Sequence, residues 1–146
     1  MRRPPGTRAN YVHFCQHSTR WGDNDTYGHM NNVVHYLLFD TTVNKWLISN
    51  GLLNIKTSPE IGLVVETGCR YLQEMSFPQV ITAGLRVASI GTSSVRYEIG
   101  LFPDDSELAA AEGFFVHVYV DAESRRPCGI PVKTRVALAG LINNTK

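Results

Sequence analysis

The sequence has almost no excess of charge of either sign, and few cysteines. Its 14 Lys and Arg residues nearly balance its 13 Asp and Glu residues, which leaves a formal net charge of +1. A broad positive field that would attract nucleic acid or an anionic membrane is therefore lacking, and we expect neither as a partner. The three cysteines, Cys15, Cys69 and Cys128, are too far apart for a CxxC metal motif and too few for a disulfide framework. Reduced thiols in a cytoplasmic protein are the simplest interpretation.

Long apolar runs are missing as well. The longest ones, such as residues 114–120, are interrupted by His or Glu and are too short to span a membrane. Arg2 and Arg3 are followed by Pro-Pro-Gly instead of the apolar segment of a secretory signal. What is present is 146 residues with 43% apolar and 18% charged side chains, as in one ordinary globular domain. We expect residues 1–10 to form a flexible N-terminal tail and residues 11–146 to form a single domain.

The hydrophobic pattern predicts one long helix over residues 31–50, which Asn31 or Asn32 can cap and Gly51 can end. Apolar side chains surround most of its circumference, so we expect it to be enclosed on nearly all sides. A weaker helix is predicted over residues 133–141. Alternating patterns predict five strands. These strands are residues 11–21, 61–73, 79–90, 93–102 and 108–121.

Short turns at residues 76–78, 91–92 and 103–106 predict that consecutive strands are antiparallel neighbours. The sequence therefore predicts an α+β fold, in which a long central helix is wrapped by a curled antiparallel sheet of about five strands. The outer face of this sheet still carries Phe, Tyr and Val residues. A second copy of the chain is the simplest surface to cover that face or to extend the sheet edge.

The segment from Arg20 to Asn32, RWGDNDTYGHMNN, is the one most informative about chemistry. Asp23 and Asp25 lie two residues apart at the predicted end of a strand, and Gly28 lets the backbone pass close to another group. His29, Asn31 and Asn32 lie at the mouth of the long helix. Free N–H groups and the positive end of the helix dipole favour a developing negative charge there. A carboxylate beside such a helix end is suited to acyl transfer.

Three other interpretations of this segment stay open at the level of sequence. Asp23 and Asp25 can be turn residues that only cap backbone N–H groups, which is the favoured role for Asp23. His29 can be a structural hydrogen-bonding partner of Asp25. Asp23, Asp25 and His29 can also bind a divalent metal, although no further ligand cluster supports such a site.

The pattern Asp-x-Asp-x-x-Gly-x-x-Asn, followed by a long apolar helix, resembles the signature of the hot-dog fold acyl-CoA thioesterases of the 4-hydroxybenzoyl-CoA thioesterase family. The resemblance is carried by residues 20–36, and the order of predicted elements matches over about residues 11–122. It implies a hot-dog fold and Asp25 as the catalytic carboxylate. It also implies that backbone N–H groups between Gly28 and Asn32 polarise the thioester carbonyl. The family uses no metal or organic cofactor, and its active sites lie at a subunit interface of dimers or tetramers.

The sequence departs from the family pattern at informative positions. One branch has a Tyr–Asp–His set, and Trp21 and Asn32 occupy its Tyr and His positions. Plant acyl-ACP thioesterases, in contrast, carry a catalytic His four residues after the corresponding Asp, which matches His29. Their Asn two residues after the Asp is replaced by Tyr27. The resemblance therefore favours Asp25 and His29 as the catalytic pair.

The resulting hypothesis is a homo-oligomeric thioesterase that acts on an acyl-CoA or an acyl carrier protein. Asp25 serves as general base or nucleophile, with Gly28, Asn31 and Asn32 positioning the substrate and stabilising the oxyanion. Glu66 is a candidate acid across the subunit interface, and Arg125 and Arg126 are candidates to bind the CoA phosphates. A non-catalytic acyl-CoA-binding module is the alternative, followed by an enoyl-CoA hydratase on the same fold.

Overall fold

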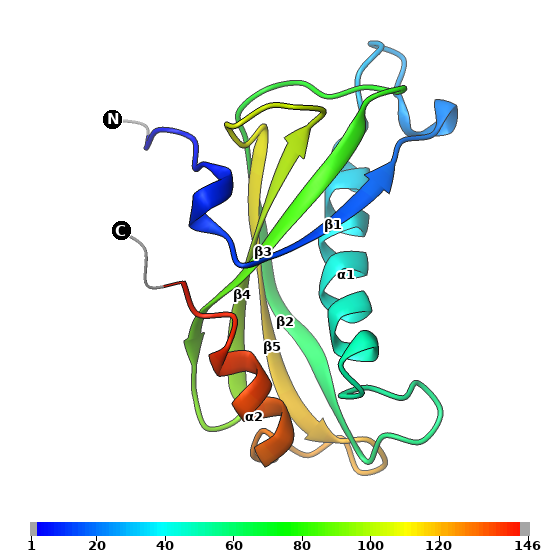
Figure 1. The fold of residues 1–146 in the computed structure, drawn as a ribbon. Coiled ribbons are helices and arrows are strands. Elements are labelled where there is room, and N and C mark those ends of the chain that lie inside the picture. Colours follow the sequence, from blue (N-terminus) through cyan, green and yellow to red (C-terminus); the bar gives the residue numbers. More distant parts are fainter. Residues whose placement is uncertain (1–2, 144–146) are drawn as a thin grey trace.

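One long helix lies against a curved antiparallel sheet in the computed structural model, which describes residues 3–143 (Figure 1). Each helix and strand predicted above is present, with its ends within three residues of the prediction. The helices are η1 (Arg8–Asn10), η2 (Trp21–Asp23), α1 (Asn32–Ser49) and α2 (Val132–Ala139). The strands are β1 (His13–Ser18), β2 (Glu60–Tyr71), β3 (Val80–Ile90), β4 (Ser94–Pro103) and β5 (Ala111–Asp121). Within residues 3–143, neither α1 nor α2 has the length and hydropathy needed to cross a lipid bilayer.

The five strands form one antiparallel sheet in the order β1-β3-β4-β5-β2. The predicted neighbours β3–β4 and β4–β5 are confirmed. The prediction that β2 pairs with β3 across the turn at residues 76–78 is wrong, because β2 pairs with β5. One edge of β3 is taken by β4 through a tight hairpin and the other by β1. With both edges of β3 occupied, β2 cannot pair with it and lies instead beside β5, where β2 is an edge strand of the sheet.

Helix α1 begins as the sequence predicts, because the Asn31 side chain accepts a hydrogen bond from the N–H of Val33. One face of the helix packs on the sheet, with Phe39 and Val43 fully buried. The opposite face is open in this chain, where Val33 is 68% and Leu37 51% exposed. The expectation of a helix enclosed on nearly all sides is thus met on one side only.

The face of the sheet toward α1 forms the core. Along β5, Phe115, His117 and Tyr119 are buried on this face, while Phe114 and Val116 on the outer face are partly covered. The outer face also carries a charged network, in which Arg70 pairs with Glu112, and Arg86 and Arg96 both pair with Glu98. The outer face is therefore more polar than the sequence pattern indicated.

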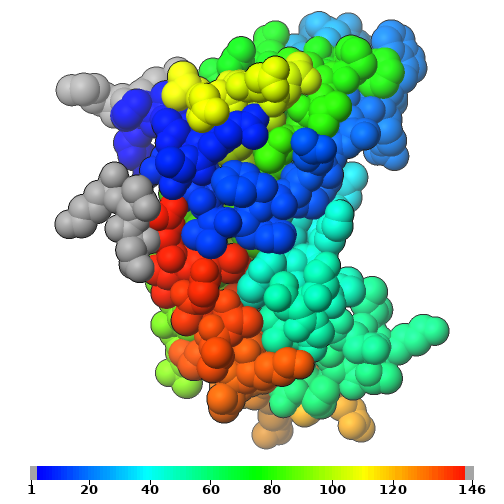
Figure 2. Space-filling view, in the orientation of Figure 1, coloured from blue at the N-terminus to red at the C-terminus, as the bar shows by residue number. Residues whose placement is uncertain are grey.

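The later residues of the predicted N-terminal tail are hydrogen-bonded to the domain. The N–H of Gly6 donates to the Glu112 carboxylate at 3.1 Å, and Thr7 forms a bridge with Leu108. Arg8 Nε donates to the carbonyl of Ser106 at 2.8 Å. Figure 2 shows this segment, in dark blue, beside the yellow loop between β4 and β5.

Candidate active site

The loop between β1 and α1 is fixed at both of its ends. Asp23 is buried and accepts hydrogen bonds from the backbone N–H and the guanidinium of Arg20. Its own carbonyl accepts from the N–H of Asn31, just before the helix. These contacts fit the structural role favoured for Asp23. Within residues 3–143, no three His, Cys, Asp or Glu side chains are grouped so that they could hold a metal ion, and so Asp23, Asp25 and His29 do not form the alternative metal set.

Asp25 and His29 face each other across a closed turn. The N–H of Asp25 donates to the carbonyl of His29 at 2.9 Å, and the N–H of Gly28 donates to the carbonyl of Asp25 at 3.2 Å. Gly28 has φ +85°, where a side chain would be strained, and no atom lies within 4 Å of its Cβ position. Gly28 is therefore needed for the turn, and the close approach of its backbone to another group stays a prediction.

The side chains of this turn form a short polar chain. Asp25 Oδ1 accepts from the N–H of Tyr27 at 2.8 Å, and Asp25 Oδ2 lies 3.4 Å from His29 Nδ1. On its other side, His29 Nε2 lies 3.9 Å from the carboxylate of Glu74. The structure thus brings together the predicted pair and adds an acid from the segment after β2 that sequence reasoning missed.

Asn31 and Asn32, at the N-terminus of α1, have different hydrogen-bonding roles. The side-chain oxygen of Asn31 caps α1 by accepting from the N–H of Val33, and the backbone N–H of Asn31 donates to the carbonyl of Asp23. Asn31 is therefore a capping residue of α1, and the role in substrate positioning that the sequence suggested for it stays a prediction. Within residues 3–143, no hydrogen bond uses the backbone N–H of Asn32, the first residue of α1. This N–H is the donor at the positive end of the helix that stays free for an anion.

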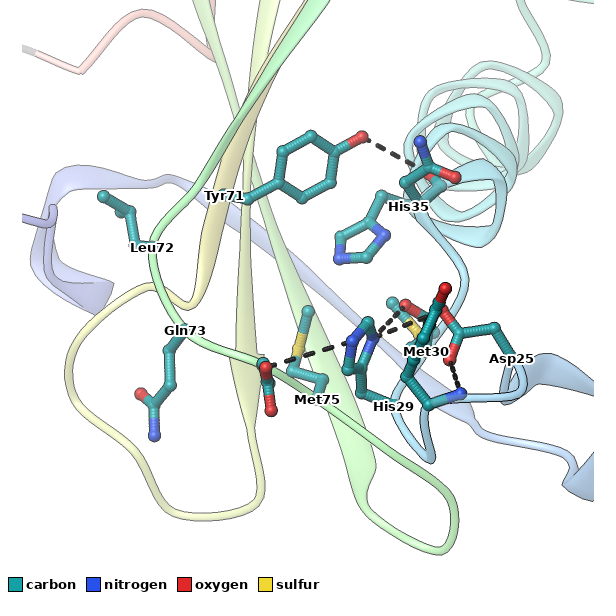
Figure 3. A pocket seen from close by; sticks show the side chains of 11 residues that line it. Asp25, His29, Met30, His35, Tyr71, Leu72, Gln73 and Met75 are labelled. Carbon is teal, nitrogen blue, oxygen red and sulfur yellow. Dashed lines mark hydrogen bonds and ion pairs between the residues drawn. The ribbon is translucent and has the colours of Figure 1, made fainter.

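Asp25, His29 and Asn32 border one cavity of about 610 Å³. Met30, Leu72 and Met75 add apolar walls, and Gln73 and Glu74 add polar ones. The remaining lining comes from Tyr27 in the loop, His35 on α1 and Tyr71 on β2. The rings of His35 and Tyr71 meet edge to face at 4.8 Å. Figure 3 shows the His35 ring between Tyr71 and His29. The cavity therefore combines a carboxylate, imidazoles and a free helix N–H with space for an organic ligand.

Comparison with known proteins supports the same chemistry. Residues 19–138 match the family model described as the thioesterase-like superfamily. The chain belongs to this superfamily. No curated protein sequence matches it significantly.

The solved structures similar to this member of the superfamily share its hot-dog fold, which confirms the predicted fold. The PA5185 protein of Pseudomonas aeruginosa is 50% identical, with a TM-score of 0.94 over 98% of this chain and 100% of that one. A Staphylococcus aureus protein solved in complex with CoA is 20% identical, with a TM-score of 0.81 over 91% of this chain and 85% of that one. A 1,4-dihydroxy-2-naphthoyl-CoA thioesterase from Synechocystis is 13% identical, with a TM-score of 0.78 over 86% of this chain and 94% of that one.

The remaining predicted residues of this thioesterase-like chain lie away from the cavity. Glu66 opposes Val116 and lies on the outer face of the sheet, because a bulge between Val64 and Glu66 changes the face that each later residue of β2 occupies. Arg125 and Arg126 follow the far end of β5, whose 11 residues separate them from the cavity. An extended strand of that length spans about 35 Å. None of the three lines the cavity of this chain.

Sequence reasoning missed His35 and Tyr71 as cavity residues. His35 is 4% exposed, and its burial lowers its pKa, with a smaller contribution from the nearby His29. The pKa of the Tyr71 hydroxyl is raised by desolvation and by the neighbouring Cys69. Both side chains are therefore neutral near pH 7. The helical spacing was the available signal, since residue 35 lies three positions after Asn32 and so shares its face of α1.

Proposed function

We propose that this protein hydrolyses the thioester bond of an acyl-CoA or an acyl carrier substrate. The observation that carries the proposal is that Asp25, His29 and Asn32, whose backbone N–H has no partner among residues 3–143, border the same cavity. Membership of the thioesterase-like superfamily supports it. The similar structures that are named for CoA thioester chemistry or contain CoA favour CoA as the carrier.

In the proposed reaction, the thioester carbonyl oxygen accepts a hydrogen bond from the N–H of Asn32, which stabilises the charge that develops on it. A water molecule attacks: its oxygen bonds to the carbonyl carbon while Asp25 takes one of its protons. The intermediate collapses, the carbon–sulfur bond breaks, and the thiolate leaves and takes the proton from Asp25. The products are a free acid and a thiol, and no redox partner or cofactor takes part.

A covalent route uses the same groups. Asp25 attacks the carbonyl carbon, expels the thiolate and forms an anhydride, which water then opens to regenerate the carboxylate. In either route His29 holds Asp25 in place through the contact between Nδ1 and Oδ2 at 3.4 Å. Both routes require Asp25 and one water molecule.

The proposal includes a homodimer or homotetramer in the cytoplasm. Strand β2 is an edge strand with Val64 45% and Val65 60% exposed, and Val33 and Leu37 are exposed on α1. Apolar edge strands of this kind are normally covered. In such an assembly Glu66, Arg125 and Arg126 would act on the cavity of another copy. Light scattering would detect the oligomer, and a monomer that is active at all concentrations would contradict this part of the proposal.

The test of the function is release of free thiol from a panel of short, medium, long and aromatic acyl-CoAs, followed with a chromogenic thiol reagent. Asp25→Asn should lower kcat by about 1,000-fold on the best substrate, because it removes the base and the nucleophile together. Asp40→Asn is the matched control, since Asp40 is an exposed carboxylate on α1 outside the cavity.

Each outcome of this assay decides between the functions. Equal turnover by Asp25→Asn and the unmodified protein would overturn the proposed role of Asp25. Tight binding of acyl-CoA without thiol release would indicate a binding module. Loss of the ultraviolet absorbance of a trans-2-enoyl-CoA without thiol release would indicate a hydratase.

A further inference from the structure

His35 has features that packing alone does not explain. It lies in the first turn of α1, is 4% exposed and lines the same cavity as Asp25 and His29. Its Nδ1 is enclosed and has no hydrogen-bond partner in the described part of the chain. Nε2 is neither enclosed in this way nor hydrogen-bonded, and Figure 3 shows a ring nitrogen of His35 turned toward the cavity. A buried imidazole in contact with a cavity is normally paired with a ligand or water.

The surroundings of His35 fix its protonation state. A neutral imidazole has one N–H donor and one bare acceptor nitrogen. Burial lowers the pKa of His35 by more than the nearby backbone carbonyls of Asn31 and Asn32 raise it. The ring is therefore neutral near pH 7. We place the proton of the neutral ring on Nδ1, because Nδ1 is the enclosed nitrogen and the other ring nitrogen is the one open to the cavity. This tautomer leaves Nε2 as a bare acceptor at the cavity.

The position of His35 on α1 relates it to the reacting carbon. Residues 32 and 35 share a face of the helix, and side chains on a helix point back toward its N-terminus. The His35 ring therefore lies over the turn that carries the free N–H of Asn32. A thioester whose carbonyl oxygen accepts from that N–H has its carbonyl carbon beside the ring.

We propose that Nε2 of His35 accepts a hydrogen bond from the water molecule that attacks the thioester, and so orients its lone pair toward the carbonyl carbon. The inference rests on the proposed thioesterase function and adds a residue to it. One water hydrogen points to His35 and the other passes to Asp25, so His35 stays neutral and no bond to it forms. In the covalent route the same water opens the anhydride.

The experiment compares two replacements of His35. His35→Phe keeps a ring against Tyr71 but has no acceptor, so kcat should fall about 100-fold while KM changes less than two-fold. His35→Gln keeps an acceptor oxygen and should recover at least ten-fold of that loss. His117→Phe is the matched control, because His117 is also buried and neutral but lies outside the cavity, and its kcat and KM should not change.

The outcomes separate this inference from the proposed function. If the unmodified protein releases no thiol from any acyl-CoA, the function itself is wrong. If that protein is active and His35→Phe keeps full kcat, the water-orienting role is overturned. A raised KM with unchanged kcat would instead place His35 against the substrate. An equal fall in kcat for His35→Phe and His35→Gln, with lowered melting temperatures, would show a packing role only.

Discussion

Two histidines of this protein are almost equally buried, and they lie in very different surroundings. His35 borders the cavity at the start of α1, whereas His117 lies in the core beneath the helix and is 2% exposed. The His117 ring packs against Tyr97 and Phe115 at centroid distances of 5.1 and 6.1 Å, in space that opens because Gly62 has no side chain. Burial lowers the pKa of both imidazoles. Burial alone therefore favours the neutral form of both histidines, and what distinguishes His35 is that it also lines a cavity.

Removing a large core side chain should affect stability strongly without affecting the cavity. Phe39 is fully buried, packs edge to face on Phe115 and lies where a side chain at residue 113 would be. Phe39→Ala should lower the free energy of unfolding by about 3–5 kcal/mol, because it leaves a hole that the neighbouring residues fill only in part. Urea unfolding measures this change. A loss below about 1 kcal/mol would contradict the role of Phe39 in stability. A fall in kcat under conditions where the variant is folded would show that the core side chain also affects the cavity.

The free energy of unfolding should fall at acid pH because of the core histidine, His117. The pKa of His117 is lowered to about 4 by burial, below its ordinary value of 6.5. Between these values the unfolded chain binds a proton that the folded chain does not. His117 therefore contributes up to about 3 kcal/mol to the free energy of unfolding above pH 6.5, and this contribution is lost as the pH falls from 6.5 to about 4.

His117→Phe should remove that part of the pH dependence, as urea unfolding at pH 7 and at pH 4.5 will show. His35→Phe supplies the comparison, because it leaves the contribution of His117 intact. If His117→Phe shows the same difference in unfolding free energy between pH 7 and pH 4.5 as the unmodified protein, His117 is protonated in the folded protein at pH 4.5.

The smallest expected effect concerns the start of α1, where the cavity and the helix meet. Asn31→Ala removes the side chain that caps the N–H of Val33, at 3.0 Å, and should cost about 1 kcal/mol of stability. Lys45→Ala is the matched control within the same helix, because Lys45 is exposed and Ala is a good helix former, so little stability should be lost. Equal effects of the two changes, measured by thermal unfolding, would contradict the capping role of Asn31.

Local patterns were enough to predict most of the fold, and long-range pairing was not. The bounds of α1 follow from Asn31 and Gly51, and the antiparallel hairpins follow from short turns. The placement of β2 beside β5 depends on which strand edges are already occupied, and a turn at residues 76–78 carries no such information.

The same limit applies to the site. Asp25 and His29 lie four residues apart, so their contact could be predicted from the sequence. Tyr71 ends β2 and Glu74 lies in the segment that follows it, so both reach the cavity only through the position of β2 in the sheet. The face occupied by Glu66 depends on a single bulge, which the alternation of residue types in β2 did not reveal.

The N-terminal segment has a practical consequence for handling the protein. Gly6 donates to Glu112, its carbonyl accepts from the N–H of Ala109, and the Arg8 guanidinium stacks 5.2 Å from the Phe102 ring. Recombinant versions that start at Tyr11 would uncover Phe102 and leave the carboxylate of Glu112 with only Arg70 and the Tyr11 hydroxyl as partners. An affinity tag fused close to Gly6 would strain the same contacts, so a removable tag at the other terminus is the better choice for the assays described above.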